Sequence, residues 1–259
     1  MSFKLLACDL DKTLMDEVPI LPDIKDFIVK VRGKGIKFAI NSGRYLKDIL
    51  EILSQSKVSC PDGYPEAIVS GQGVFIHYLK GNHYVEDKQW NEEREKELEI
   101  LSQEIGWKSK LWEKLIEEKF KIKPVKKEID QGVFRVFFNS EEEAEKIRQA
   151  LMKNGDFKYT AFIRNRHIIL ATLSTTHKGN ALMRVAEHFN ICPCEILAIG
   201  DSHNDEDMLD GRYGFIPGAP SNAEEGIKLL VKANNGYVAS QPEGMGVVEI
   251  VDYLLAKST

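Results

Sequence analysis

Two aspartates near the N-terminus are spaced so that both can act on one atom. Asp9 and Asp11 stand in the segment DLDKT (residues 9–13), directly after a compact apolar run at residues 3–8. Side chains at positions i and i+2 of an extended segment point the same way, so the two carboxylates can address one point. Two carboxylates there repel each other unless a cation lies between them or one is protonated. Either condition suits catalysis, although a pattern this short also occurs by chance.

A second polar group follows the next apolar run, at residues 36–40. It consists of Asn41, Ser42, Gly43 and Arg44, directly before a helical pattern. A serine hydroxyl and free backbone N–H groups at a helix N-terminus form a site for an oxyanion. A plain helix cap by Ser42 is the alternative interpretation.

Lys178 stands near the start of the helical pattern at residues 176–189. A cation is electrostatically disfavoured at a helix N-terminus, because the N-terminal end of the helix dipole is positive. A bound anion would account for this lysine. An ordinary exposed lysine is the alternative.

A fourth group, GDSHND at residues 200–205, follows an apolar run at residues 196–199. Asp201 ends the run, and Asp205 lies about one turn further on, after Asn204. Hard carboxylate and amide oxygens on a strand-end loop suit Mg²⁺, which takes few protein ligands and keeps several waters. Enrichment of acids at a helix start accounts for Glu206 and Asp207 but does not require Asp201.

The elements that must position these residues alternate between strand and helix. Residues 3–8, 36–40 and 67–69 read as strands, with helices at residues 24–31 and 45–53 between them. This order predicts a parallel sheet with right-handed crossovers. The last third continues the pattern with a helix at 176–189, strands at 196–199 and 213–216, a capping box at 221–224 that opens a helix, and a closing helix at 247–255.

The middle of the chain departs from this order. It begins with a hairpin pattern at residues 74–85 that turns at Gly81-Asn82, followed by a charged helical stretch at residues 91–120. A strand at 133–138, a helix capped by Ser140 with Glu143, and a strand pair within 158–170 complete it. We therefore predict an α/β fold, a doubly wound parallel sheet formed by residues 1–75 and 174–259, with an inserted α+β domain at residues 76–173.

Composition narrows the class of protein. The 259 residues carry a formal net charge of −5, which argues against a nucleic-acid partner. No run approaches the roughly 18 apolar residues of a membrane span, and the N-terminus lacks an apolar signal core, so we expect a cytoplasmic protein. The four cysteines, Cys8, Cys60, Cys192 and Cys194, are expected to be reduced.

Together the four groups resemble the motifs of the haloacid dehalogenase (HAD) superfamily. DLDKT stands as the first motif, Ser42 as the second, Lys178 as the third and GDSHND as the fourth. The position of the insert resembles that of the large α+β cap of class IIB, the Cof-type and sucrose-phosphatase-like branch. The resemblance covers both outer thirds of the chain and implies a Rossmann-like core with a cap that selects the substrate.

The resemblance also implies a mechanism. Asp9 would attack phosphorus and form an aspartyl-phosphate, while Asp11 would protonate the leaving alcohol and then deprotonate the attacking water. Ser42 and Lys178 would hold the transferring oxygens. Mg²⁺ would be held by Asp9, by the backbone carbonyl of Asp11 and by Asp201, with Asn204 and Asp205 completing or orienting the shell.

Three further positions take their expected roles from the same resemblance. Gly43 and Arg44 would face the substrate, and so would Gln72, which stands where relatives often carry asparagine. His203 stands where glycine is common and is expected to point at solvent. Arg135, Lys158, Arg164 and Arg166 are cations of the insert that could bind a second anionic group, but for each of them ordinary surface charge is the favoured interpretation.

We therefore expect a magnesium-dependent phosphomonoesterase acting on a small-metabolite phosphate, with a sugar phosphate as the favoured class. A phosphomutase that uses the same aspartyl-phosphate is the first alternative. A receiver-like phospho-acceptor and a non-catalytic phosphosugar-binding protein are the others. The expected partner is a small-molecule phosphate ester, with no nucleic acid and no membrane, and the chain is expected to be a monomer or small homo-oligomer.

Overall fold

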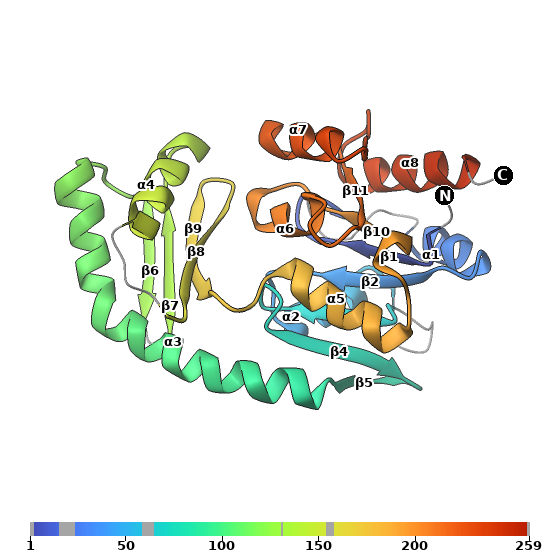
Figure 1. The fold of residues 1–259 in the computed structure, drawn as a ribbon, viewed down its shortest axis with the longest axis horizontal. Coiled ribbons are helices and arrows are strands. Elements are labelled where there is room, and N and C mark those ends of the chain that lie inside the picture. Colours follow the sequence, from blue (N-terminus) through green and yellow to red (C-terminus); the bar gives the residue numbers. More distant parts are fainter. Residues whose placement is uncertain (1–2, 16–23, 59–64, 131, 154–157, 258–259) are drawn as a thin grey trace. The chain divides into compact units, whose positions relative to one another are not determined.

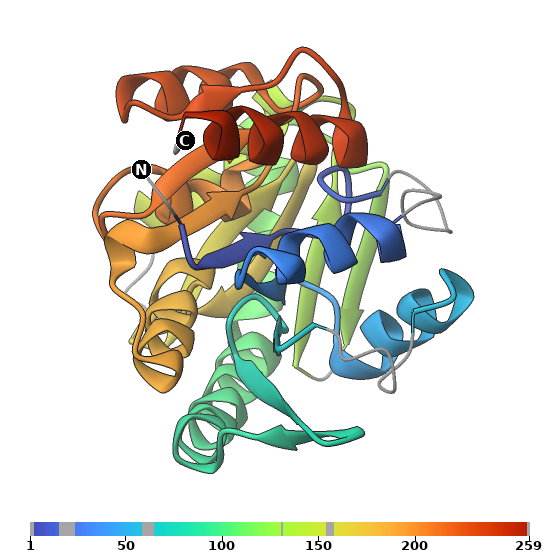
Figure 2. The same ribbon diagram turned by 90° about the vertical axis from the view of Figure 1, so that its right-hand side faces the viewer.

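A computed structural model describes residues 3–15, 24–58, 65–130, 132–153 and 158–257. Its contacts divide the chain into two compact units. The first comprises Met1–Asn91, His177–Asp201 and Asp205–Thr259, and the second comprises Glu92–Thr176 with Ser202–Asn204. Figures 1 and 2 show the elements of each unit along the chain.

The first unit is built on an eight-stranded sheet in the order β12-β11-β10-β1-β2-β3-β4-β5. The parallel strands are β1 (Leu5–Cys8), β2 (Lys37–Asn41), β3 (Ala67–Ser70), β10 (Ile196–Ile199), β11 (Ile216–Ala219) and β12 (Tyr237–Val238). The antiparallel strands β4 (Phe75–Lys80) and β5 (His83–Glu86) extend one edge. Strands β1 and β10 are buried along their whole length, as expected of strands covered on both faces.

Helices cover both faces of this sheet. One face packs against α1 (Ile24–Gly33), α2 (Leu46–Gln55) and α8 (Glu243–Ala256), and the other against α5 (Lys178–Phe189), α6 (Glu206–Leu209) and α7 (Glu225–Ala233). A hydrophobic core lies on each face of the sheet. Alternate residues of β1 pack into the two cores, Leu6 into one and Leu5 into the other. The predicted doubly wound α/β fold is confirmed.

The second unit is a four-stranded antiparallel sheet with two helices. Its strand order is β6 (Lys126–Asp130), β7 (Val133–Phe137), β9 (Ile168–Leu173), β8 (Thr160–Asn165). The helices are α3 (Lys88–Lys114), whose first turn lies in the first unit and which continues into a π-helical turn at Leu115–Lys119, and α4 (Glu141–Lys153). Trp112, Phe134 and Phe162 meet edge to face at centroid distances of 4.9 to 5.9 Å and form the centre of its core.

The hairpin at residues 74–85 forms as predicted but joins a different sheet. It becomes β4 and β5, and it continues the sheet of the first unit through antiparallel pairing of β3 with β4. Ile76 and Tyr78 bury their side chains in the first unit's core. The second unit therefore begins at Glu92 rather than at residue 76. Alternation of apolar residues shows that a hairpin forms, but it carries no information on which sheet the hairpin extends.

Two other predicted elements differ in the last third of the chain. The strand placed at residues 213–216 is β11 at Ile216–Ala219, because Gly214 has a positive φ of 78° that interrupts the extended backbone before it. The capping box at residues 221–224 is wrong, since α7 begins at Glu225 without a side-chain cap. Strands β6 and β12 were not predicted.

The structure bears on two further expectations, that the cysteines are reduced and that the chain has no membrane-spanning segment. Cys8, Cys192 and Cys194 are free thiols, and Cys60 lies outside the described residues. Within the described ranges, no helix combines the length and the apolar character needed to cross a membrane.

Candidate active site

The strand register brings three of the four sequence motifs to one edge of the first unit's sheet. Cys8 in β1 pairs in parallel with Ile40 in β2 and with Ile199 in β10. Asp9 and Gly200, which follow β1 and β10, and Asn41, the last residue of β2, therefore lie at the carboxyl ends of three adjacent strands. In open α/β sheets this edge is where ligands bind.

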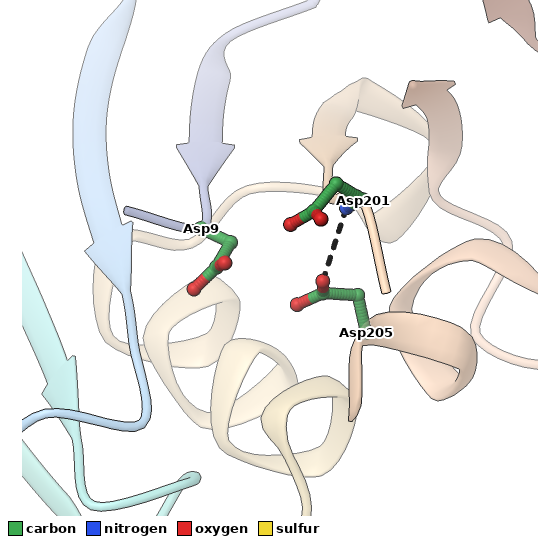
Figure 3. A group of neighbouring side chains, drawn as sticks. All are labelled: Asp9, Asp201 and Asp205. Atoms are coloured by element: carbon green, nitrogen blue, oxygen red, sulfur yellow. Dashed lines mark hydrogen bonds between the residues drawn. The ribbon is translucent and has the colours of Figure 1, made fainter. Parts of the chain in front are cut away.

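Three aspartates form a buried cluster at this edge. Ligand oxygens of Asp9, Asp201 and Asp205 lie within 4.8 Å of one another. Figure 3 shows Asp9 and Asp201 at the ends of their strands, with Asp205 facing them from the following helical turn. The backbone N–H of Asp201 donates to Asp205 Oδ2 at 3.1 Å, and Thr13 Oγ1 donates to Asp201 Oδ1 at 3.0 Å.

Lys178, the first residue of α5, lies inside this cluster. Its Nζ is 2.6 Å from Asp9 Oδ1 and 2.6 Å from Asp205 Oδ1, and the side chain is fully buried. Burial alone would lower the pKa of Lys178, but Asp205 and Asp9 outweigh that effect and raise it. The alternative of an ordinary exposed lysine is therefore wrong, and two carboxylates account for a cation at a helix N-terminus.

The pKa of Asp9 is strongly perturbed. Burial raises the pKa of Asp9 well above its ordinary value. Lys178 opposes this shift, whereas Asp205 and Asp201 add to it. With all three carboxylates ionised, their charge and that of one ammonium leave this buried site with an excess of two negative charges. A buried excess of this size calls for a compensating cation.

Ser42 is fully buried in the loop after β2. Its backbone N–H donates to Val69 O at 2.9 Å, and its Oγ accepts a hydrogen bond from the backbone N–H of Arg44 at 3.2 Å. Helix α2 begins only at Leu46, preceded by Tyr45, so Ser42 is not its cap. Asn41 donates from Nδ2 to the carbonyl of Lys178 at 2.9 Å and thereby ties the second motif to the third.

Arg44 binds Asp11 in a bidentate ion pair. Its Nε lies 2.8 Å from Oδ2 and its Nη2 lies 2.7 Å from Oδ1. The hydrogen bond to Asp11 raises the pKa of Arg44. Both side chains are about two-fifths exposed, 42% and 37%. A carboxylate that accepts both arms of a guanidinium is ionised, so Asp11 here is in the form that accepts a proton.

Gln72 lies against the second motif in a turn of unusual backbone conformation. Gly71, Gln72 and Gly73 all have positive φ, at 62°, 62° and 95°. The Gln72 N–H donates to Ser42 O at 3.2 Å, and its side-chain amide lies so close to Gly43 that a Cβ there would clash with it. A non-glycine residue held at positive φ is uncommon and often marks a functional site.

Comparison with known proteins decides the family. A family model described as sucrose-6F-phosphate phosphohydrolase matches residues 3–254. The chain belongs to this family. It is thus a phosphatase of the HAD superfamily, class IIB, as the four motifs and the position of the insert predicted.

Two curated proteins resemble the chain. A phosphoglycolate phosphatase of Methanococcoides burtonii is 30% identical over 124 residues, which span 47% of this chain and about half, 50%, of that protein. A phosphatase-like protein of Streptococcus pyogenes serotype M6 is 24% identical over 263 aligned positions, covering 91% of this chain and 95% of that protein.

Solved structures of the superfamily share the fold. The sucrose-phosphatase of Synechocystis sp. PCC6803, in complex with sucrose and phosphate, has a TM-score of 0.69 at 15% identity and covers 98% of both chains. A HAD-like hydrolase of Bacillus subtilis has a TM-score of 0.64 at 21% identity, covering 97% of this chain and 99% of that chain. Hydrolysis is favoured over the phosphomutase and non-enzymatic alternatives, because the family and its named relatives are phosphatases.

The aspartate cluster fits the divalent metal that phosphatases of this superfamily generally use. Its donors are hard carboxylate oxygens, and its excess of two negative charges matches a dication. Both oxygens of Asp205 already accept hydrogen bonds, from Lys178 and from the Asp201 N–H, which suits an orienting role. Asn204 lies buried in the turn His203–Asp205 but groups with the second unit, so its part in metal binding stays a prediction.

Thr13, Asn41 and Asn222 make contacts at the site, although the sequence suggested no specific role for them. Thr13 and Asn41 stand inside the first and second motif groups, and this position could have drawn attention to them. Asn222 gave no such signal. It donates from Nδ2 to Lys12 O at 2.8 Å across 210 positions of sequence, and its Oδ1 accepts from the N–H of Glu243.

Asp207, which the sequence assigned to acid enrichment at a helix start, has a specific partner. Its Oδ2 accepts a hydrogen bond of 2.6 Å from the backbone N–H of Gly179, next to Lys178. Burial nevertheless raises the pKa of Asp207 to about 6. A Cβ at Gly179 would clash with this carboxylate, so the glycine is required here.

The cations of the second unit are mostly paired within it. Arg135 lies 3.0 Å from Glu128, Arg164 lies 3.2 Å from Glu145, and Arg166 lies 3.9 Å from Glu141. The ammonium of Lys158 lies 5.1 Å from the ring centre of Tyr159. His203 is half-buried rather than directed fully at solvent. A role for these cations in binding substrate stays a prediction.

Proposed function

We propose that this phosphatase hydrolyses the phosphate monoester of a small metabolite, with a sugar phosphate as substrate class, through an aspartyl-phosphate on Asp9 and with Mg²⁺ bound. The observation that carries the proposal is the buried contact of Lys178 with Asp9 at the carboxyl edge of the sheet. A carboxylate nucleophile needs a fixed neighbouring cation, because phosphoryl oxygens bring further negative charge to it.

In the first step a carboxylate oxygen of Asp9 attacks phosphorus, and the bond from phosphorus to the leaving alkoxide oxygen breaks. The alkoxide takes a proton from Asp11. Lys178, 2.6 Å from Asp9 Oδ1, then lies beside the transferred group and stabilises its oxygens. Ser42, at the end of the adjacent strand, is proposed to donate a hydrogen bond to the same oxygens.

In the second step water attacks phosphorus, Asp11 accepts a proton from it, and the Asp9–phosphorus bond breaks. The ionised Asp11 held by Arg44 is the form that this step needs. The first step needs the protonated form, so Arg44 must release Asp11 when substrate binds. A phosphate ester offers Arg44 an alternative bidentate partner, and Gly43 and Gln72 flank the same loop.

Asp9, Asp201 and the backbone carbonyl of Asp11 are the proposed ligands of Mg²⁺, with Asn204 and Asp205 completing or orienting the shell. The three backbone hydrogen bonds within residues 10–15 use the carbonyls of Leu10 and Met15 and leave that of Asp11 outside them. Bound there, Mg²⁺ supplies positive charge that neutralises the phosphoryl oxygens. Thr13 holds Asp201 in place through its Oδ1.

The substrate class rests on the family rather than on a residue. The family description names a sucrose phosphate, and the Synechocystis relative binds sucrose and phosphate. We propose that the inserted unit determines which phosphate ester is bound. One face of its sheet carries Arg135, Leu170 and Ile163, which are aligned across β7, β9 and β8. This mixture of charged and aliphatic surface suits a carbohydrate.

A cytoplasmic location stays a prediction.

The proposal is tested with a panel of sugar, polyol and nucleotide phosphates, assayed for phosphate release with Mg²⁺ and with EDTA. We expect sugar phosphates to give the highest kcat/KM, activity to require Mg²⁺, and Asp9→Asn to lower kcat by at least about 10⁴-fold. Wild-type turnover by Asp9→Asn would overturn the nucleophile. Isomerisation of a hexose phosphate without net phosphate release would instead indicate a phosphomutase.

A further inference from the structure

An exposed apolar stripe runs along α3 in the second unit. Trp107, Leu111 and Ile100 expose 77%, 65% and 38% of their surface. Their spacing of seven and four residues places them on one side of the helix. A separate stripe is buried in the unit's own core and consists of Leu101, Ile105, Trp112 and Ile116. The helix is therefore apolar on two sides, and its own unit covers only one.

Between residues 92 and 114 the exposed charges of α3 are segregated along the helix, and Lys88 in the first turn is a further exposed cation. From residue 92 to 99 they are Glu92, Glu93, Glu95, Lys96 and Glu99, whereas from residue 103 to 114 they are Lys110 and Lys114. The helix dipole favours acids only in the first turn, which here ends at Asn91. Lys114 has a weak exposed pair with Glu118 at 3.8 Å. The segregation therefore exceeds what stability of the isolated helix explains.

A glycine stands in the middle of the same surface. Gly106, next to Trp107, is exposed, and no atom lies within 4 Å of the position that a Cβ would take. Glycine in a helix interior costs about 1 kcal/mol relative to alanine. Its advantage is that it lets another backbone or a large side chain approach closely.

We propose that this face of α3 pairs with the same face of a second copy of the chain, in antiparallel orientation about a twofold axis. Glu99 and Glu95 of each copy then lie opposite Lys110 and Lys114 of the other. In this register Trp107 of each lies about one helical turn, roughly 6 Å along the axis, from Gly106 of the other. The surface is self-complementary only in this orientation, as an isologous interface requires. The proposal is independent of the substrate and of the catalytic mechanism.

The size of this surface determines the affinity that we expect for the dimer. At 1.5 Å per residue α3 is about 40 Å long, and pairing of one helix per copy gives an interface at the low end of the specific range. We therefore expect a reversible dimer with a Kd on the order of 10 μM. Its four charge pairs are exposed, so salt should weaken it.

Sedimentation velocity across a concentration series tests the proposal. The wild-type chain should pass from its 29.4 kDa monomer to a dimer as concentration rises, and Trp107→Asp should raise Kd at least about tenfold. Leu229→Asp is the matched control, because Leu229 is an exposed apolar residue, 59% exposed, on α7 of the first unit. It should dimerise like wild type. A wild-type chain that stays monomeric at several hundred micromolar, or equal losses in both variants, overturns the proposal.

Charge exchange tests the antiparallel orientation. Lys110→Glu with Lys114→Glu, and separately Glu95→Lys with Glu99→Lys, should each weaken self-association, because each places like charges opposite one another. An equimolar mixture of the two double variants should form heterodimers with near wild-type affinity. Both variants should keep wild-type thermal stability and phosphatase activity. Failure of the mixture to associate, with both variants folded, overturns the proposed pairing.

Discussion

At the scale of single residues, the two cations nearest the aspartates differ in how permanently they are bound. Lys178 is fully buried between two carboxylates, so its position is fixed before any ligand arrives. Arg44 pairs with Asp11 at a half-exposed position where a competing anion can reach it. The site thus combines one preorganised charge with one exchangeable charge, and we propose that exchange frees Asp11 for proton transfer.

Arg44→Met should slow turnover of all substrates, but most strongly those with alkyl leaving groups. Without Arg44 no ion pair holds Asp11 at the site before substrate arrives. Alkoxides need the proton that Asp11 is proposed to deliver, whereas nitrophenolate leaves without it. We expect kcat to fall about 10²-fold for a sugar phosphate and less than tenfold for nitrophenyl phosphate. Arg44→Lys tests whether charge alone suffices. Equal losses on both substrates would contradict an orienting role for Arg44.

The raised pKa of Asp207 predicts how the free energy of unfolding depends on pH. Its folded pKa of about 6 lies above the ordinary value of 3.8, so the stability it contributes is complete below pH 3.8 and is lost as pH rises through 6. Asp207→Asn removes this loss. In EDTA, the variant should match wild type near pH 4 and exceed it above pH 6, by up to about 3 kcal/mol in unfolding free energy. Denaturant unfolding from pH 4 to 8 measures this, and parallel pH profiles would contradict it.

At the scale of elements, the strand ends and the turns after them hold the site, and glycines make the turns possible. Gly200 follows β10, and a Cβ at that position would lie 2.5 Å from the Asp205 side chain. The turn can therefore bring Asp205 back to Asp201 only if residue 200 has no side chain.

Gly200→Ala should displace Asp205 and weaken metal binding. We expect the Mg²⁺ concentration for half-maximal activity to rise at least about tenfold, with a smaller change in substrate KM. Gly33→Ala is the matched control, because no atom lies within 4 Å of the added Cβ at the end of α1. A titration of activity against Mg²⁺ compares them. Similar Mg²⁺ requirements in the two variants would contradict the role given to the 200–205 turn.

The sequence predicted these elements well where its signals are local. An apolar run followed by an acid located β1 and β10, and an amphipathic stripe located α5. It failed for contacts between distant elements. Whether the 74–85 hairpin joins the first or the second sheet depends on burial of Ile76 and Tyr78 by other segments. The partner of Asn222 lies 210 positions away, and no local pattern encodes it.

At the scale of the whole molecule, the topology explains why the motifs are spread along the chain. Strand β1 lies between β2 and β10, so the first motif meets the second on one side and the fourth on the other. Thr13 and Asp201 are 188 positions apart in sequence but are hydrogen-bonded, and the segment Glu92–Thr176 of the second unit lies between them in the chain. A large insert can therefore vary in sequence, and with it the substrate, while the strand ends keep the chemistry.

The central claim is the covalent intermediate on Asp9, and chemical trapping tests it most directly. The Asp11→Asn variant with nitrophenyl phosphate and Mg²⁺ should form the aspartyl-phosphate, because this leaving group needs no acid, and should hydrolyse it slowly, because the base is missing. Borohydride then reduces an acyl phosphate to an alcohol. Mass spectrometry should find homoserine at position 9, only with substrate and Mg²⁺ present. An unmodified Asp9 after a stoichiometric burst of nitrophenol, or homoserine at another position, would contradict the mechanism.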